Sequence, residues 1–210
     1  MGSNELAEKV AQLLEKPGPL TIVQAGDPVL RQKIAFYDGQ LDDDTLGRLI
    51  ARMRETMSEI HGAVGLAAPQ VGLPLRLAVL ETPAEFSARL IERGQQPVPF
   101  TVLVNPSYKA MGRSRTASFE GCLSMVGWQA VVARPDRIRL TREDETGRHL
   151  VEAYDGLGAR IVQHEADHLD GMLYLDRSEL RSLSTTEQVV ARWGVAGVTA
   201  ASQQLGFALP

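Results

Sequence analysis

The chain has 210 residues, 44% of them apolar, and its 22 Lys and Arg against 26 Asp and Glu give a formal net charge of −4. These values describe a single globular domain and exclude a disordered chain, because the apolar surface is large enough to offset the loss of chain entropy. No window approaches the roughly 18 consecutive apolar residues of a membrane span. Residues 1–10 lack the basic start and apolar run of a signal peptide. We therefore expect a cytoplasmic protein without a membrane partner.

The single cysteine, Cys122, excludes an internal disulfide framework and fits a reducing compartment. The slightly acidic balance disfavours a nucleic-acid partner, since neutralising phosphates requires clustered Lys and Arg. The densest basic segment, residues 134–142, alternates its charges with Ile138 and Leu140. This alternation predicts a strand whose basic side chains face solvent.

Two helices are predicted before residue 62. Apolar residues recur at helical spacing over residues 4–14, and Pro17-Gly18-Pro19 ends that pattern. A stronger pattern begins with an acidic turn at Asp42 and ends before Gly62. Its apolar positions are Leu46, Leu49, Ile50, Met53, Met57 and Ile60. We expect the methionines of this stripe to be core residues.

The middle of the chain favours antiparallel strands. Residues 63–72 are small, glycine-bearing and almost uncharged, which permits close approach of another backbone or a ligand. Residues 82–99, with several Pro and Gln, are expected to form an extended loop or an insertion. A turn is predicted at residues 143–147. Strands are predicted at 75–81, 100–105, 129–133, 137–142 and 149–154.

Helical periodicity returns at residues 157–169 and ends at Gly171, and a short helix is predicted at 186–193. The pattern predicts an α+β fold in which antiparallel strands pack around the helix 157–169, with an N-terminal helix and a helical C-terminal segment. We expect residues 1–210 to form one catalytic domain, with residues 178–210 as a C-terminal extension.

The strongest chemical signal is His164-Glu165-Ala166-Asp167-His168. On a helix, positions i and i+4 lie one turn apart on the same face, so both imidazoles can bind one metal ion. Glu165 then lies beside the metal-bound water. This H-E-x-x-H spacing is typical of metal-dependent hydrolases, although a single match also occurs by chance in unrelated helices.

A catalytic metal site usually needs a third protein ligand. The chain follows the metzincin pattern as far as Gly171 and then has Tyr174 in place of the third histidine. His61 and His149 are expected to be surface or capping residues. We favour Cys122, because Gly121 permits close backbone approach and a thiolate binds a borderline-soft metal.

Three ordered motifs resemble those of peptide deformylases, and the resemblance extends roughly from residue 23 to residue 177. The motifs are Gly65-Leu66-Ala67-Ala68-Pro69-Gln70, Glu120-Gly121-Cys122-Leu123-Ser124 and Gln163-His164-Glu165-Ala166-Asp167-His168. Two positions depart from the family pattern: Ala63 replaces a glycine, and Gln129 replaces a frequent arginine. Neither is a ligand or the acid/base, so the departures concern substrate positioning.

The resemblance implies removal of the formyl group from N-formyl-methionyl peptides, with release of formate. Cys122, His164 and His168 would hold one divalent metal that makes a hydroxide available from water. Glu165 would accept the water proton and return it to the departing amine. The alternative is an H-E-x-x-H metalloprotease of another class.

The resemblance also implies roles around the metal. The Gln70 side-chain amide and the Leu123 backbone N–H would stabilise the oxyanion, although Gln70 alone would suggest an ordinary turn cap. Gly65 would allow the substrate backbone to pair alongside, and Val64 would contact the methionine side chain.

The expected cofactor is one divalent ion. The family favours Fe(II), with Zn, Ni or Co as replacements. The expected partners are N-formyl-methionyl nascent peptides and, by proximity to them, the ribosome near its exit tunnel. No motif indicates direct binding to nucleic acid.

Overall fold

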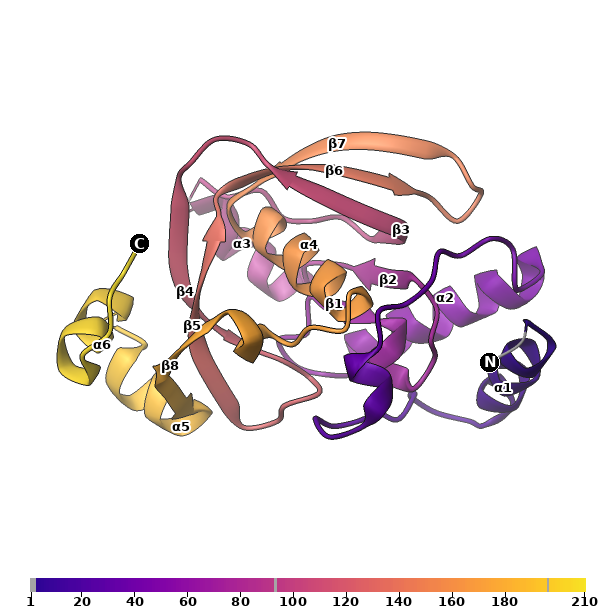
Figure 1. Ribbon diagram of the computed structural model, residues 1–210, viewed down its shortest axis with the longest axis horizontal. Coiled ribbons are helices and arrows are strands. Elements are labelled where there is room, and N and C mark those ends of the chain that lie inside the picture. Colours follow the sequence, from indigo (N-terminus) through magenta and orange to yellow (C-terminus); the bar gives the residue numbers. More distant parts are fainter. Residues whose placement is uncertain (1–2, 93, 196) are drawn as a thin grey trace.

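The computed structural model describes residues 3–92, 94–195 and 197–210 (Figure 1). The helices, including short 3₁₀ and π segments, are α1 (Ser3–Glu15), η1 (Pro28–Arg31), α2 (Asp43–Ser58), η2 (Ala68–Val71), α3 (Ala84–Glu92), α4 (Gly156–Leu169), η3 (Tyr174–Arg177), α5 (Thr186–Gln188), η4 (Val189–Trp193) and α6 (Gly197–Leu205). The strands are β1 (Gly65–Ala67), β2 (Leu77–Leu80), β3 (Thr101–Ala110), β4 (Arg115–Gly121), β5 (Trp128–Pro135), β6 (Arg137–Glu143), β7 (His149–Asp155) and β8 (Ser178–Thr185).

The strands form two antiparallel sheets. The larger sheet has the order β1-β2-β3-β6-β7, and the smaller one has the order β4-β5-β8. Helix α4 packs against strands of both sheets, so it lies at the centre of the molecule (Figure 1). Helices α1 and α2 lie at one end of the molecule, and α5 and α6 lie at the other. The predicted α+β architecture around a central helix is therefore confirmed.

Helix α2 follows the sequence signals closely. The Asp42 carboxylate caps its first turn by accepting the Thr45 N–H at 2.9 Å. The predicted stripe is buried in the main core from Leu46 to Met57, with both methionines at most 2% exposed. The apolar periodicity predicts this helix correctly because its apolar residues lie on one face, and that face packs against a single core.

The prediction of a loop at residues 82–99 is wrong for half of its length, because α3 occupies Ala84–Glu92. Pro83 precedes the first turn, and Phe86 and Leu90 lie one turn apart on the inner face. The Pro and Gln residues that suggested a loop flank the helix and do not interrupt it.

The smaller sheet was only partly predicted. Its central strand β5 has a clear apolar pattern, whereas β4 and β8 are polar segments that pair with it on either side. The predicted C-terminal helix is confirmed as α5 and η4, and α6 follows it. These helices cover the smaller sheet through Val189, Trp193 and Ala201.

The end of α4 is fixed by long-range contacts. The Leu169 carbonyl accepts the Ile34 N–H at 2.9 Å and the Arg76 Nη1 at 3.1 Å. Gly171 has a φ of +75°, and a Cβ placed there would lie 2.8 Å from the Arg31 carbonyl oxygen. The turn after the helix therefore requires glycine for both conformation and space.

Replacing Gly171 by alanine should destabilise the fold more than the same change at Gly147. Gly147 has a φ of +78°, but a Cβ added at this position would meet no heavy atom within 4 Å. Gly147→Ala should cost about 1–2 kcal/mol of backbone strain. Gly171→Ala should cost about 1–3 kcal/mol more, from overpacking against Arg31. Urea denaturation measures both free energies, and equal losses would contradict the packing argument.

Candidate metal centre and active-site pocket

Three potential metal ligands meet where the smaller sheet contacts α4. Cys122 directly follows β4, while His164 and His168 lie on α4. The Cys122 Sγ lies 3.3 Å from the His168 Nε2, and one ligand atom from each residue falls within 4.8 Å of the others. One thiolate and two imidazoles suit Zn or Fe(II), so this cluster fits a single divalent metal.

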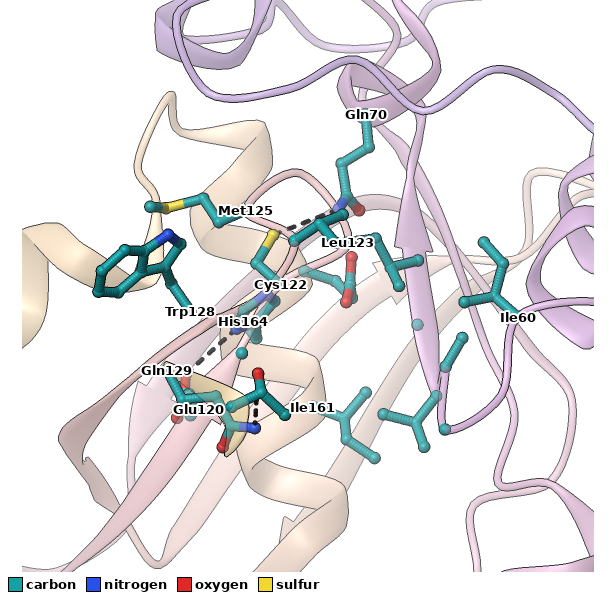
Figure 2. A pocket seen from close by; sticks show the side chains of 18 of the residues that line it. Ile60, Gln70, Glu120, Cys122, Leu123, Met125, Trp128, Gln129, Ile161 and His164 are labelled. Atoms are coloured by element: carbon teal, nitrogen blue, oxygen red, sulfur yellow. Dashed lines mark hydrogen bonds and ion pairs between the residues drawn. The ribbon is translucent and has the colours of Figure 1, made fainter. Parts of the chain in front are cut away.

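Two of the three, Cys122 and His164, lie in the wall of a pocket of about 510 Å³ (Figure 2). Figure 2 shows Met125 and Trp128 on one side of Cys122 and Ile60 on the far side. Val64 and Ile161 add further apolar lining. The pocket therefore has an apolar interior beside the three potential ligands.

Glu165 is buried beside these ligands. Among the described residues, no hydrogen-bond partner is found for its Oε2 atom. Burial raises the pKa of Glu165 to about 7, against the attraction of the His164 charge. A carboxylate with a pKa near neutrality is suited to accept and return a proton.

Gly65 is required for Glu165 to occupy this place. A Cβ on Gly65 would lie 2.4 Å from the Glu165 Oε1 and 2.8 Å from its Cγ. Strand β1 and helix α4 therefore approach each other through this glycine, with the carboxylate stem against the strand backbone.

The Gln70 side chain is 1% exposed and makes contacts at both ends of its amide. Its Oε1 accepts the Ala67 N–H at 2.9 Å, which is the turn-capping role suggested by sequence alone. Its Nε2 points toward the Cys122 Sγ at 3.5 Å and the Ser124 Oγ at 3.4 Å (Figure 2). The turn contact thus orients an amide donor toward the potential metal ligands.

The two histidines have opposite electrostatic environments. Burial disfavours the charged form of His164, but hydrogen bonds to Cys122 and Glu120 raise its pKa well above the ordinary value. Burial and the neighbouring His164 charge lower the pKa of His168. The His164 Nδ1 lies 3.1 Å from the Glu120 Oε2, which leaves its Nε2 for a metal.

Glu120 and Arg134 form a buried ion pair that the sequence did not predict. The Arg134 Nε and Nη2 donate to the two Glu120 carboxylate oxygens at 2.7 and 2.9 Å. Burial opposes the charged form of Glu120, but His164 and Arg134 hold its pKa well below the ordinary value. Arg160 also pairs with Glu120. The prediction that the basic side chains of residues 134–142 face solvent is wrong for Arg134 and Arg142, since their side chains are 2% and 9% exposed.

The same arginine reaches α4. The Arg134 Nη1 donates to the Asp167 Oδ2 at 2.8 Å. Asp167 also accepts two hydrogen bonds from Arg177, at 2.8 and 2.9 Å, and one from the Tyr108 hydroxyl at 3.2 Å. Arg134 therefore joins the strand before Cys122 to the helix that carries both histidines.

His61 and His149 lie away from the metal centre, as expected. Both are exposed and approach surface carboxylates, His61 near Glu85 at 3.5 Å and His149 near Glu143 at 3.4 Å. His61 nevertheless lies at the rim of the pocket.

The family model for polypeptide deformylase matches residues 19–184. Peptide deformylase 3 of Streptomyces avermitilis is 57% identical over 209 residues, which cover 99% of this chain and 93% of that protein. The chain belongs to the polypeptide deformylase family. Peptide deformylases are metal-dependent hydrolases that remove the N-formyl group from an N-terminal methionine, and this is the activity of the chain. The comparison favours a deformylase over a metalloprotease of another class.

Solved deformylase structures share the fold. The enzyme from Thermotoga maritima is 32% identical, with a TM-score of 0.64 over 78% of this chain and 99% of that one. A class I type b deformylase from Acinetobacter baumannii, bound to Met-Ala-Ser, is 28% identical, with a TM-score of 0.68 over 77% and 99%. In the present chain, none of the helices within the described residues has the length and apolar character needed to span a membrane.

Removing the buried guanidinium should be costly. Arg134→Met leaves Glu120 and Asp167 as buried carboxylates without this partner, and should lower the free energy of unfolding by about 3–5 kcal/mol. Arg139→Met, on the exposed face of β6, should change it by less than about 0.5 kcal/mol. Denaturant unfolding of the two variants tests this, and similar losses would show that the pair contributes little.

Gly65→Ala should impair turnover through Glu165. The added methyl displaces the carboxylate, so we expect kcat to fall by about 10- to 100-fold while the circular dichroism spectrum is preserved. If the effect acts through the base, adding Gly65→Ala to a Glu165→Gln enzyme should cost little further activity. A full additive loss in the double variant would argue against displacement of Glu165.

Proposed function

We propose that Cys122, His164 and His168 hold the single divalent metal, and that the ion in the cell is Fe(II), with Zn, Ni or Co able to replace it. The convergence of the three ligand atoms within 4.8 Å supports this assignment. When bound, the metal supplies Lewis-acid activation of water at neutral pH. Glu120 keeps His164 oriented by accepting from its Nδ1.

Glu165 acts as the general base and then as the general acid. It accepts the proton of the attacking water, and it returns that proton to the amine that leaves the formyl carbon. Its burial and its pKa of about 7 support both steps. One carboxylate thus serves both proton transfers.

The Gln70 Nε2 and the Leu123 N–H stabilise the negative charge that develops on the formyl oxygen. The contact between the Gln70 Oε1 and the Ala67 N–H supports this role, because it fixes the amide before substrate binds. A formyl carbon bears only hydrogen, so it fits between these donors, where the methyl of an acetyl group would not.

The substrate backbone pairs with the free edge of β1, which is the end strand of its sheet. The Val64 carbonyl accepts the Glu81 N–H from the β2 side. Because alternate residues of an antiparallel pair point their N–H and C=O groups in opposite directions, those of Gly65 face the open edge. Val64, with Leu157 and Ile161, lines the space for the methionine side chain.

The whole chain acts as one catalytic domain. Thr186, at the start of the C-terminal helices, lines the pocket and accepts a hydrogen bond from Gln129 at 3.4 Å. The substrates are nascent chains in the cytoplasm, close to the ribosomal exit. The lone cysteine and the formylated substrate class support this setting.

The direct test is formate release from formyl-Met-Ala-Ser, with metal content measured on the same sample. Glu165→Gln should keep the metal, because the ligands are untouched, and should lower kcat by at least about 100-fold. Activity within a few-fold of the parent enzyme would contradict the acid/base role.

Cys122→Ser should lose or weaken metal binding, since a hydroxyl is harder and far less acidic than a thiol. Metal stoichiometry after dialysis against a weak chelator measures this, with circular dichroism as the check on folding. Unchanged stoichiometry and affinity in a folded variant would remove Cys122 from the ligand set.

A further inference from the structure

A second cavity of about 570 Å³ adjoins the active-site pocket. The two share Ile60, His61 and Ala63 in their linings, so they meet at the segment between α2 and β1. The other walls of the second cavity are the last turns of α2 and the segment that enters α3. The mechanism described above gives this space no role.

The direction of the bound chain follows from β1. Gln70, the proposed oxyanion donor, follows the C-terminal end of β1, so the formyl end of the chain lies on that side and the rest of the substrate leaves toward lower residue numbers. With the methionine opposite Gly65, an antiparallel chain places its third residue opposite Ala63. Ile60 to Ala63 form a turn, with a φ of +81° at Gly62 and a hydrogen bond from the Ala63 N–H to the Ile60 carbonyl at 3.0 Å. Strand pairing therefore ends at Ala63, and the next two residues of the bound chain lie beside this turn. The fourth and fifth residues therefore reach the boundary of the second cavity.

The lining of this cavity holds three carboxylates and one guanidinium, and one of these carboxylates, Glu55, also pairs with Arg52 at 3.1 Å. The guanidinium of Arg54 is already engaged, since it donates to both Glu81 oxygens at 2.7 and 2.6 Å. Glu85, at the start of α3, has only the His61 ring within ion-pair distance among the described residues. The floor is apolar and includes Met57 and Ala63.

We propose that the second cavity binds the fourth and fifth residues of the formylated chain and favours lysine or arginine there. The inference rests on the deformylase reaction and on pairing of the substrate with β1. A long basic side chain suits both features of the cavity, because its methylene stem packs on the apolar floor while its charge approaches Glu85. A substrate preference thus extends beyond the methionine pocket.

The test compares kcat/KM for three amidated peptides: formyl-Met-Ala-Ser-Lys-Lys, formyl-Met-Ala-Ser-Ala-Ala and formyl-Met-Ala-Ser-Glu-Glu. We expect the Lys peptide to exceed the Ala peptide, and the Ala peptide to exceed the Glu peptide, by about two- to fivefold at each step, as for partly exposed charge pairs. The differences should shrink at high salt. Equal values for the three peptides would overturn the proposal.

Two variants test whether the preference for lysine arises in the second cavity. Glu85→Gln should reduce the Lys-to-Glu ratio, whereas Glu145→Gln removes the same charge from the exposed β6–β7 turn and should leave the ratio unchanged. Ala51→Trp fills the cavity from the exposed side of α2 and should remove the gain from the Lys residues. An unchanged ratio in both Glu85→Gln and Ala51→Trp would place the preference elsewhere and overturn the proposal.

The tripeptide formyl-Met-Ala-Ser distinguishes a failure of the proposed active site from a failure of the second-cavity proposal. It ends before the second cavity, so its kcat/KM should be the same in the parent enzyme and in both cavity variants. Failure to hydrolyse the tripeptide would count against the proposed active site, whereas normal hydrolysis with no preference among the longer peptides would count only against the second cavity.

Discussion

The structure depends on one buried guanidinium. Arg134 projects from β5 and donates to Glu120 on β4 and to Asp167 on α4, so it joins the smaller sheet to the helix that carries both histidines. Cys122 follows Glu120 by two residues, and His168 follows Asp167 by one. Any shift of the sheet along the helix would break these charge-assisted hydrogen bonds before it separated the thiol from the imidazoles. The ion pair therefore fixes the distances within the metal cluster.

The features that depend on local pattern were predictable from the sequence. The stripe of α2 and the i, i+4 histidines of α4 each need only one helix. The strands β6 and β7 need only their own alternation, and β5 needs only its apolar run. The three motifs were sufficient to indicate the family before any contact was known. In these cases the information lies within about 15 consecutive residues, which is the range over which periodicity is informative.

The features that depend on strand register were not predictable. Arg134 begins a segment whose basic residues alternate with Ile138 and Leu140, as solvent-facing residues would, and only its pairing with β4 brings it beside Glu120. Strand β4 is polar along most of its length, and its strand conformation depends on backbone pairing with β5, which extends over all of its residues. A charged residue within the apolar run of β5 was the one available signal, but its partners lie 14 and 33 residues away in the chain. Sequence spacing does not reveal such pairs.

The glycine at the start of β1 has a consequence for substrate choice. Its bare Cα has the Glu165 carboxylate on one side, while its N–H and C=O face the outer edge of the sheet, where we propose that the substrate backbone pairs. Backbone pairing at this edge would close the side of the pocket that Glu165 lines. A free formylated amino acid, which has no following amides to pair with the edge, would leave that side open. Under the proposed mode of binding, the enzyme would therefore distinguish a protein chain from a metabolite of identical reactive chemistry, because only the polymer backbone closes the pocket beside Glu165.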